Sequence, residues 1–201
     1  GPRSRQAGIT RLFRALDFGA SGRLRSLQLQ YFATLRGFRA ADAVAWETPF
    51  QSLCSLYGID PSAGATVAEF HKLVSDESSS LYCSLEELGR LASAVEASGA
   101  EAATARPGLL FKVFRALDVG RRGSLGPAQV CQYLRLCGMD GNDTELTSMY
   151  GSVWWAYGTD DAGGLDVSGF ADFVNEEGGD AHLSDGRLRH LLAALQQAAG
   201  A

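Results

Sequence analysis

Features that mark secreted, metal-binding and nucleic-acid-binding proteins are missing from this sequence. The four cysteines lack any CxxC spacing and the three histidines are isolated, so we expect neither a zinc site nor a disulfide framework. The cysteines instead fit the core of a protein in a reducing compartment. A net charge of −5 offers no positive field to a nucleic-acid backbone. Because no apolar run approaches the roughly 20 residues that span a bilayer, we expect a soluble, cytoplasmic protein.

Catalytic motifs are missing too. The sequence has no nucleophile elbow, zinc-protease motif or phosphate-binding loop, and no histidine lies near a cysteine or carboxylate in a recognisable arrangement. We therefore expect no enzymatic activity. Gly1 and Pro2, without an initiator Met, are typical of the remnant of a cleaved tag, which leaves open whether the chain is a fragment of a longer one.

What the sequence does contain is an internal repeat. Residues 13–19, FRALDFG, return as residues 114–120, FRALDVG, at an offset of 118 − 17 = 101. A second segment, YGID at 57–60, aligns with YGTD at 157–160 at an offset of 157 − 57 = 100. A fixed offset of this kind predicts two copies of one structural unit in tandem.

Apolar residues within the repeat recur every three to four positions, which predicts an all-α fold. The predicted helices cover 9–16, 27–35, 41–57, 67–74, 85–95, 109–117, 130–137, 143–157 and 188–195. Ser84 followed by Glu87 is a capping-box pattern, and Asn142 or Asp143 fits the N-cap of a later helix. Trp155 lies off the apolar stripe of its helix, so we expect it to be either a surface anchor for a partner or part of a second packing layer.

The segment between the first two predicted helices of each copy resembles the EF-hand loop, which has ligands at positions one, three, five, seven, nine and twelve and a turn glycine at six. The family's Asp at one, Gly at six and apolar residue at eight are matched by Asp17, Gly22, Leu24 and by Asp118, Gly123, Leu125. Position twelve, where the family has a bidentate Glu, is Gln28 or Gln129. The resemblance therefore implies the fold of the loop without most of its metal chemistry.

The second loop of each copy is degenerate in a different way. Loop two begins at Gly58, and its possible calcium ligands are Asp60, Ser62 and Glu69. It alone has a carboxylate at position twelve, although Ala63 stands at six, where the turn needs a positive φ. The resemblance implies no cofactor other than weakly bound calcium at this loop. Lesser candidate ligands in the other loops are Asp17, Asp118, Asp160 and Asp166.

The EF-hand resemblance implies two lobes, each a pair of hands joined by a short β bridge at position eight and followed by a trailing helix. We place the N-terminal lobe at 1–98, a linker at 99–106 and the C-terminal lobe at 107–201. The apolar face of the last helix consists of Leu188, Leu191, Leu192 and Leu195. This face predicts one of three roles: binding a partner, filling the groove of its own lobe, or pairing with a second copy in a homodimer.

The favoured hypothesis is a non-catalytic interaction or regulatory protein similar to the calcium-independent relatives of calmodulin, myosin light chains and centrins. By that resemblance its partner is a protein that offers an amphipathic helix, and its location is cytoplasmic, with cytoskeletal association a further expectation. Two alternatives stay open. One is a weak calcium sensor that uses loop two, and the other is the regulatory EF-hand region of a larger protein.

Overall fold

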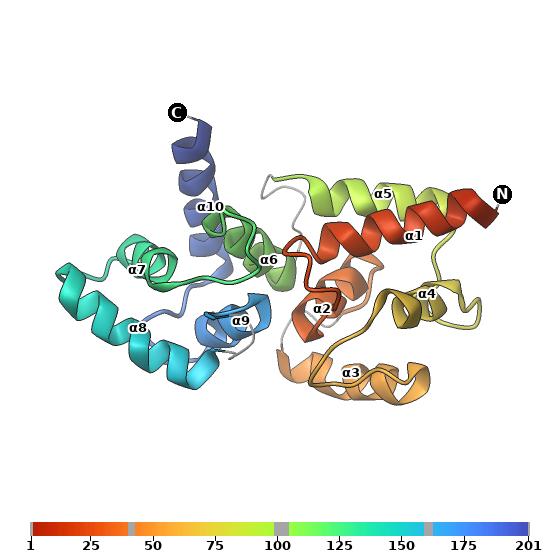
Figure 1. Ribbon diagram of the computed structural model, residues 1–201, viewed down its shortest axis with the longest axis horizontal. Coiled ribbons are helices and arrows are strands. Elements are labelled where there is room, and N and C mark those ends of the chain that lie inside the picture. The colour runs from red at the N-terminus through yellow and green to blue at the C-terminus, as the bar shows by residue number, and fades with distance from the viewer. Residues whose placement is uncertain (1, 40–42, 99–104, 159–162, 201) are drawn as a thin grey trace. The chain divides into compact units, whose positions relative to one another are not determined.

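The computed structural model describes residues 2–39, 43–98, 105–158 and 163–200 (Figure 1). All regular elements in these ranges are helices, which confirms the predicted all-α class. They are α1 Pro2–Leu16, α2 Ser26–Leu35, α3 Ala43–Tyr57, α4 Val67–Ser75, α5 Leu85–Glu96, α6 Arg106–Leu117, α7 Pro127–Leu136, α8 Asp143–Tyr157, α9 Val167–Asn175 and α10 Asp185–Gly200. No described helix has the length and apolarity needed to cross a membrane.

The chain divides into two compact units, Gly1–Gly108 (unit 1) and Leu109–Ala201 (unit 2). Most of the predicted linker, 99–106, lies outside the described residues, and α6 begins at Arg106. The predicted capping box of Ser84 and Glu87 is present at α5. Of the two N-cap candidates for α8, Asn142 is the cap, and it forms a capping box with Glu145. All four cysteines are free, and Cys137 is the one that is only partly buried.

Each unit is built around one phenylalanine that contacts two other rings. In unit 1 the ring centroid of Phe70 lies 5.8 Å from that of Phe13 and 5.2 Å from that of Phe32. In unit 2 the ring of Phe170 lies 5.8 Å from Phe114 and 5.2 Å from Tyr133. All six rings are buried, and burying a side chain of this size stabilises the fold by about 1.5–3 kcal/mol. The sequence repeat is thus a repeat of the core.

An antiparallel bridge joins the two helix–loop–helix segments of each unit. Leu24 pairs with Ala65 through N–H···O distances of 2.9 and 2.8 Å, and Leu125 pairs with Leu165 at 2.8 and 3.0 Å. A Cβ atom at Gly64 would lie 2.5 Å from the carbonyl oxygen of Leu24. Because real Cβ atoms do not approach oxygen so closely, glycine is required at this crossing of two backbones.

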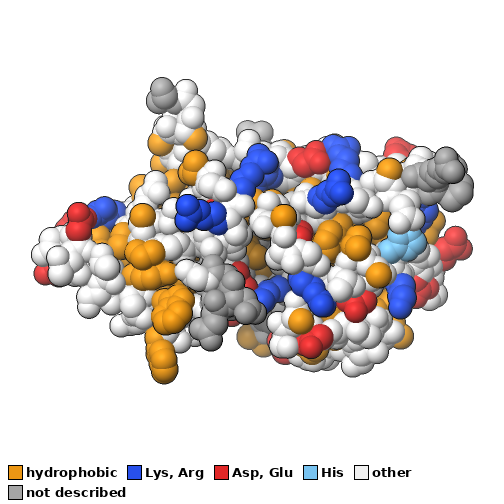
Figure 2. Space-filling view, viewed as in Figure 1, with side chains coloured by type: hydrophobic (Ala, Val, Ile, Leu, Met, Phe, Trp, Pro, Cys, Tyr) orange, Lys and Arg blue, Asp and Glu red, His pale blue; other side chains and the backbone are white. Residues whose placement is uncertain are grey.

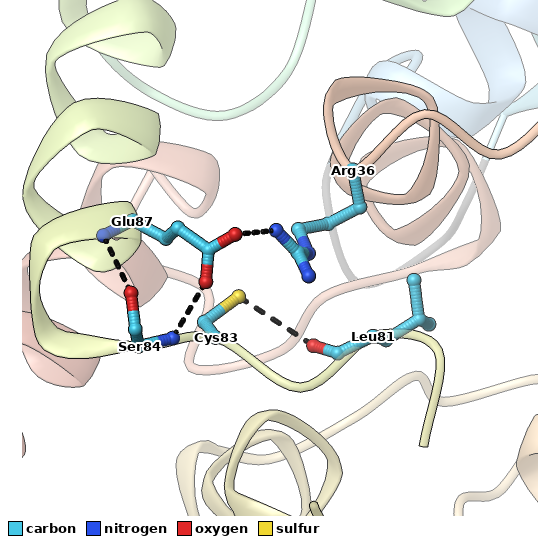
Figure 3. Close-up of polar contacts among 5 residues, drawn as sticks. All are labelled: Arg36, Leu81, Cys83, Ser84 and Glu87. Atoms are coloured by element: carbon cyan, nitrogen blue, oxygen red, sulfur yellow. Dashed lines mark hydrogen bonds and ion pairs between the residues drawn. The ribbon is translucent and has the colours of Figure 1, made fainter.

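The trailing helix α5 lies along α1 in unit 1 (Figure 1). Its side chains Leu88, Leu91, Ala92 and Val95 are buried. The guanidinium of Arg11 on α1 donates 3.0 and 2.6 Å hydrogen bonds to the carboxylate of Glu96. Figure 3 shows the other end of α5, where Glu87 accepts a 2.8 Å bond from the Ser84 N–H and also pairs with Arg36, the C-cap of α2. Helix α5 is therefore held within its own unit at both ends.

The trailing helix α10 of unit 2 has the same apolar face. The four leucines proposed as partner-binding residues, Leu188, Leu191, Leu192 and Leu195, are all buried. Next to them, the Arg187 guanidinium donates a 3.2 Å bond to the carbonyl of Cys137 at the end of α7. This arrangement leaves little of the leucine face exposed for a partner.

Candidate functional site

The first-position carboxylates of loops one and three bind the backbone of their own loops. Asp17 accepts bonds of 2.9 and 2.7 Å from the N–H and hydroxyl of Ser21 and one of 2.7 Å from the Gly22 N–H. Asp118 accepts bonds of 3.0 and 2.7 Å from the N–H groups of Arg122 and Gly123. Both carboxylates are buried, so these bonds satisfy charges that would otherwise be costly to remove from water.

In loop two the predicted ligands are engaged in local hydrogen bonds. Asp60 accepts from the N–H and hydroxyl of Ser62 at 2.8 and 2.6 Å, and these bonds lower the pKa of the Asp60 carboxyl. Glu69 accepts a 2.7 Å bond from the Thr66 N–H, and this bond completes the capping box of α4. The loop reverses at Gly64, with φ +86°, rather than at Ala63. Glycine at the seventh position adopts this conformation without strain, so the turn moves by one residue.

In loop four Asp160 lies outside the described residues, and Asp166 is the N-cap of α9, where it accepts a 2.8 Å bond from the Gly169 N–H. A Cβ atom at Gly169 would collide with the carbonyl oxygen of Tyr157. A position-twelve side chain is therefore excluded by the backbone of the preceding helix. Within the described ranges, no three His, Cys, Asp or Glu side chains come together in a group able to hold a metal.

Unit 2 has an apolar cavity of about 200 Å³ between α7, α8, α9 and the segment after α9. Its lining residues are Leu134, Met139, Met149, Ser152, Val153, Phe173, Glu176, Gly179, Asp180 and Ala181. The chain has only two methionines, and both are in this wall. Because methionine is flexible and polarisable, such a wall adapts to the shape of an inserted apolar group.

Two exposed tryptophans lie on α8, the helix that contributes Met149, Ser152 and Val153 to the cavity wall. The side chain of Trp155 is 85% exposed and that of Trp154 is 37% exposed. Trp155 follows Ser152, a lining residue, by three positions, which places the two side chains side by side on the helix surface. Figure 2 shows hydrophobic side chains gathered over α8. The predicted partner anchor Trp155 is thus an exposed side chain on a helix that also lines an apolar cavity.

Tyr157 holds two of the lining residues in place. Its ring centroid lies 5.6 Å from that of Phe173, and its hydroxyl donates a hydrogen bond to Oε2 of Glu176. That bond, together with partial burial, raises the pKa of the Tyr157 hydroxyl. Glu176 and Asp180 line the cavity and are themselves exposed, so the site combines apolar walls with two acidic residues at the surface.

Nothing in the one-dimensional pattern joins residues as distant as Leu134 and Ala181, so the cavity was not predictable from periodicity. The repeat contains one indication of the cavity. Ala181 corresponds to Leu81 at the offset of 100, and the loss of a leucine side chain at a buried position leaves space.

Comparisons with protein-family models, with curated proteins and with solved structures found no match to this chain.

Proposed function

We propose that this chain is a non-catalytic interaction protein built from two pairs of degenerate EF-hands, and that its unit 2 docks a helical segment of a partner protein. The observation that carries the proposal is the apolar cavity walled by Met139 and Met149. Helix-in-groove recognition places the apolar surface of an amphipathic helix in such a cavity. The exposed ring of Trp155 on the same helix offers a second apolar contact.

Several observations support the EF-hand part of the proposal. Each unit repeats the order helix, loop, helix, and the position-eight residues Leu24 and Leu125 pair with the equivalent residues of the second loop. The buried Asp17 and Asp118 carboxylates bind loop N–H groups. A loop stabilised in this way keeps its shape by its own hydrogen bonds, which favours an interaction protein over an ion-dependent sensor.

The size of the cavity suits one side chain. Burying a leucine, methionine or phenylalanine side chain of a partner contributes about 1.5–3 kcal/mol, which is a gain of roughly tenfold to a hundredfold in affinity. Filling the cavity from within should remove this gain. Unit 1 indicates the residue to use, because Leu81 occupies the position equivalent to Ala181 and is itself buried.

The test uses the full chain and a fluorescein-labelled amphipathic helical peptide of about 16 residues, which is long enough to be partly helical alone. Fluorescence anisotropy should show binding to the wild type and a loss of roughly tenfold or more in affinity with Ala181→Leu. Val44→Ala is the matched control, since Val44 is 88% exposed on α3 in unit 1 and should leave affinity unchanged. No binding by any amphipathic peptide, or equal binding by Ala181→Leu with an unchanged melting temperature, would refute the proposal.

A further inference from the structure

A tyrosine–carboxylate hydrogen bond occurs at equivalent positions of the two units, Tyr57–Asp76 and Tyr157–Glu176, but the surroundings of the carboxylate differ. In unit 1 the Tyr57 hydroxyl donates a 2.8 Å bond to Oδ2 of Asp76, and Oδ1 of Asp76 accepts from the N–H and the hydroxyl of Ser78 at 3.0 and 2.6 Å. Both oxygens of Asp76 are thereby engaged within unit 1. These bonds also lower the pKa of the Asp76 carboxyl, as expected for a carboxylate that accepts several donors.

In unit 2 the tyrosine is kept and its surroundings change. Tyr157 donates to Oε2 of Glu176, but the residue equivalent to Ser78 is Gly178, which has no hydroxyl to donate to Oε1. Glutamate is also one methylene longer than the aspartate of unit 1, and here the carboxylate lines the apolar cavity. In unit 2, Oε1 of Glu176 is therefore an acceptor at the cavity, whereas in unit 1 the corresponding oxygen of Asp76 accepts hydrogen bonds from Ser78.

A second acid is present only in this copy of the repeat. Asp180 lines the cavity, and the equivalent residue of unit 1 is Ser80. Residues 176–180 read EEGGD and contain no basic residue. Two carboxylates beside Met139, Met149 and Phe173 form a site with an apolar interior and an anionic edge. A ligand complementary to this site must be apolar along its length and positively charged at its end.

We infer that the residue anchored in this cavity is a single long cationic side chain, lysine or arginine, of the partner helix. This inference rests on the proposed function and specifies its ligand. The methylene stem packs against Met149, Val153 and Phe173, and the charged head reaches the carboxylates of Glu176 and Asp180 at the edge. Lysine and arginine regularly bury their stems in this way while the charge stays near water. Tyr157 acts as a positioning residue, since its hydroxyl fixes one oxygen of Glu176 and leaves the other for the ligand.

The experiment uses the same labelled helical peptide with one guest position that carries arginine, lysine or norleucine. With the wild-type full chain we expect the arginine and lysine peptides to bind about fivefold or more tightly than the norleucine peptide, because charge-assisted hydrogen bonds add to the burial of the stem. The preference should shrink as salt is raised, since the carboxylates are at an exposed edge. The double variant Glu176→Gln/Asp180→Asn should bind all three peptides as the wild type binds norleucine.

Two further variants separate a specific role from a structural one. Tyr157→Phe keeps the ring contact with Phe173 and should reduce the cationic preference without changing norleucine binding. Glu77→Gln, a charge change in unit 1 at the position equivalent to Glu177, should leave both unchanged. If the norleucine peptide binds as tightly as the arginine peptide, or if the double variant keeps the preference, the inference is wrong and the proposed function stands. Failure of every peptide to bind the wild type would instead refute the proposed function.

Discussion

Replacing Asp118 tests whether loop three is held by its own hydrogen bonds or by an ion. The Asp118 side chain is 3% exposed, and its two oxygens accept from the N–H groups of Arg122 and Gly123. Asp118→Ala leaves both part-buried N–H groups without this acceptor, and a hydrogen bond to a charged group contributes about 1.5–3 kcal/mol. We therefore expect a loss of roughly 2–5 kcal/mol in the free energy of unfolding of unit 2. The loss is at the lower end of this range if water enters the loop and replaces the carboxylate as acceptor.

Urea denaturation, followed by circular dichroism, measures this loss as a lower midpoint with an unchanged slope. Asp143→Asn is the matched control, because Asp143 is an exposed carboxylate of the same unit that pairs with Arg135, and such pairs contribute at most about 1 kcal/mol. Both variants are compared with the wild type in chelator and in calcium. A destabilisation by Asp118→Ala that appears only in calcium would show that Asp118 is an ion ligand and would refute the reasoning given for loop three.

Two other predictions concern individual carboxylates. Glu69 is already engaged in capping α4 through the Thr66 N–H, so calorimetry of the wild type should show at most one weak calcium-binding event. Glu69→Gln should abolish this event, and Glu77→Gln should leave it unchanged. Tight binding, or binding that survives Glu69→Gln, would contradict the assignment to loop two. Hydrogen bonds from the Ser84 backbone and from Arg36 lower the pKa of Glu87 to about 2. Its stabilising effect is therefore complete above the unfolded-state pKa of about 4.3 and is lost as the pH falls toward about 2. Melting temperatures of the wild type and Glu87→Gln measured across this range should converge at low pH, and curves that stay parallel would contradict the prediction.

The fold class and the helix caps followed from local signals in the sequence. Apolar spacing predicted the helices, and Ser84 with Glu87 predicted the start of α5 at Leu85 because a capping box involves residues only three positions apart. Helix ends were less accurate. The final helix was predicted at 188–195 and extends over Asp185–Gly200, since its terminal turns carry polar residues that periodicity does not register.

The details of the sites depended on contacts that local patterns do not contain. Glu69 could be identified as a position-twelve carboxylate, but its sequence position does not reveal that Thr66 already occupies it. The collision that Gly169 avoids with the Tyr157 carbonyl arises from a close approach between two helices. The cavity beside Met139 and Ala181 likewise results from how side chains of three helices fill space. Such features follow from tertiary packing, which a single sequence does not resolve.

The matched ring clusters around Phe70 and Phe170 also affect how the chain folds. Since the two clusters have nearly the same geometry, a helix from one unit can dock transiently in the other, and such mispairing between similar domains is a known kinetic trap. One difference opposes it. The Tyr133 hydroxyl donates a buried 2.7 Å bond to the carbonyl of Ala181, and Phe32, its counterpart at the offset of 101, has no hydroxyl to replace that bond. The hydroxyl of Tyr133 thus favours docking of α7 within its own unit, because α2 of unit 1 cannot form this bond in its place.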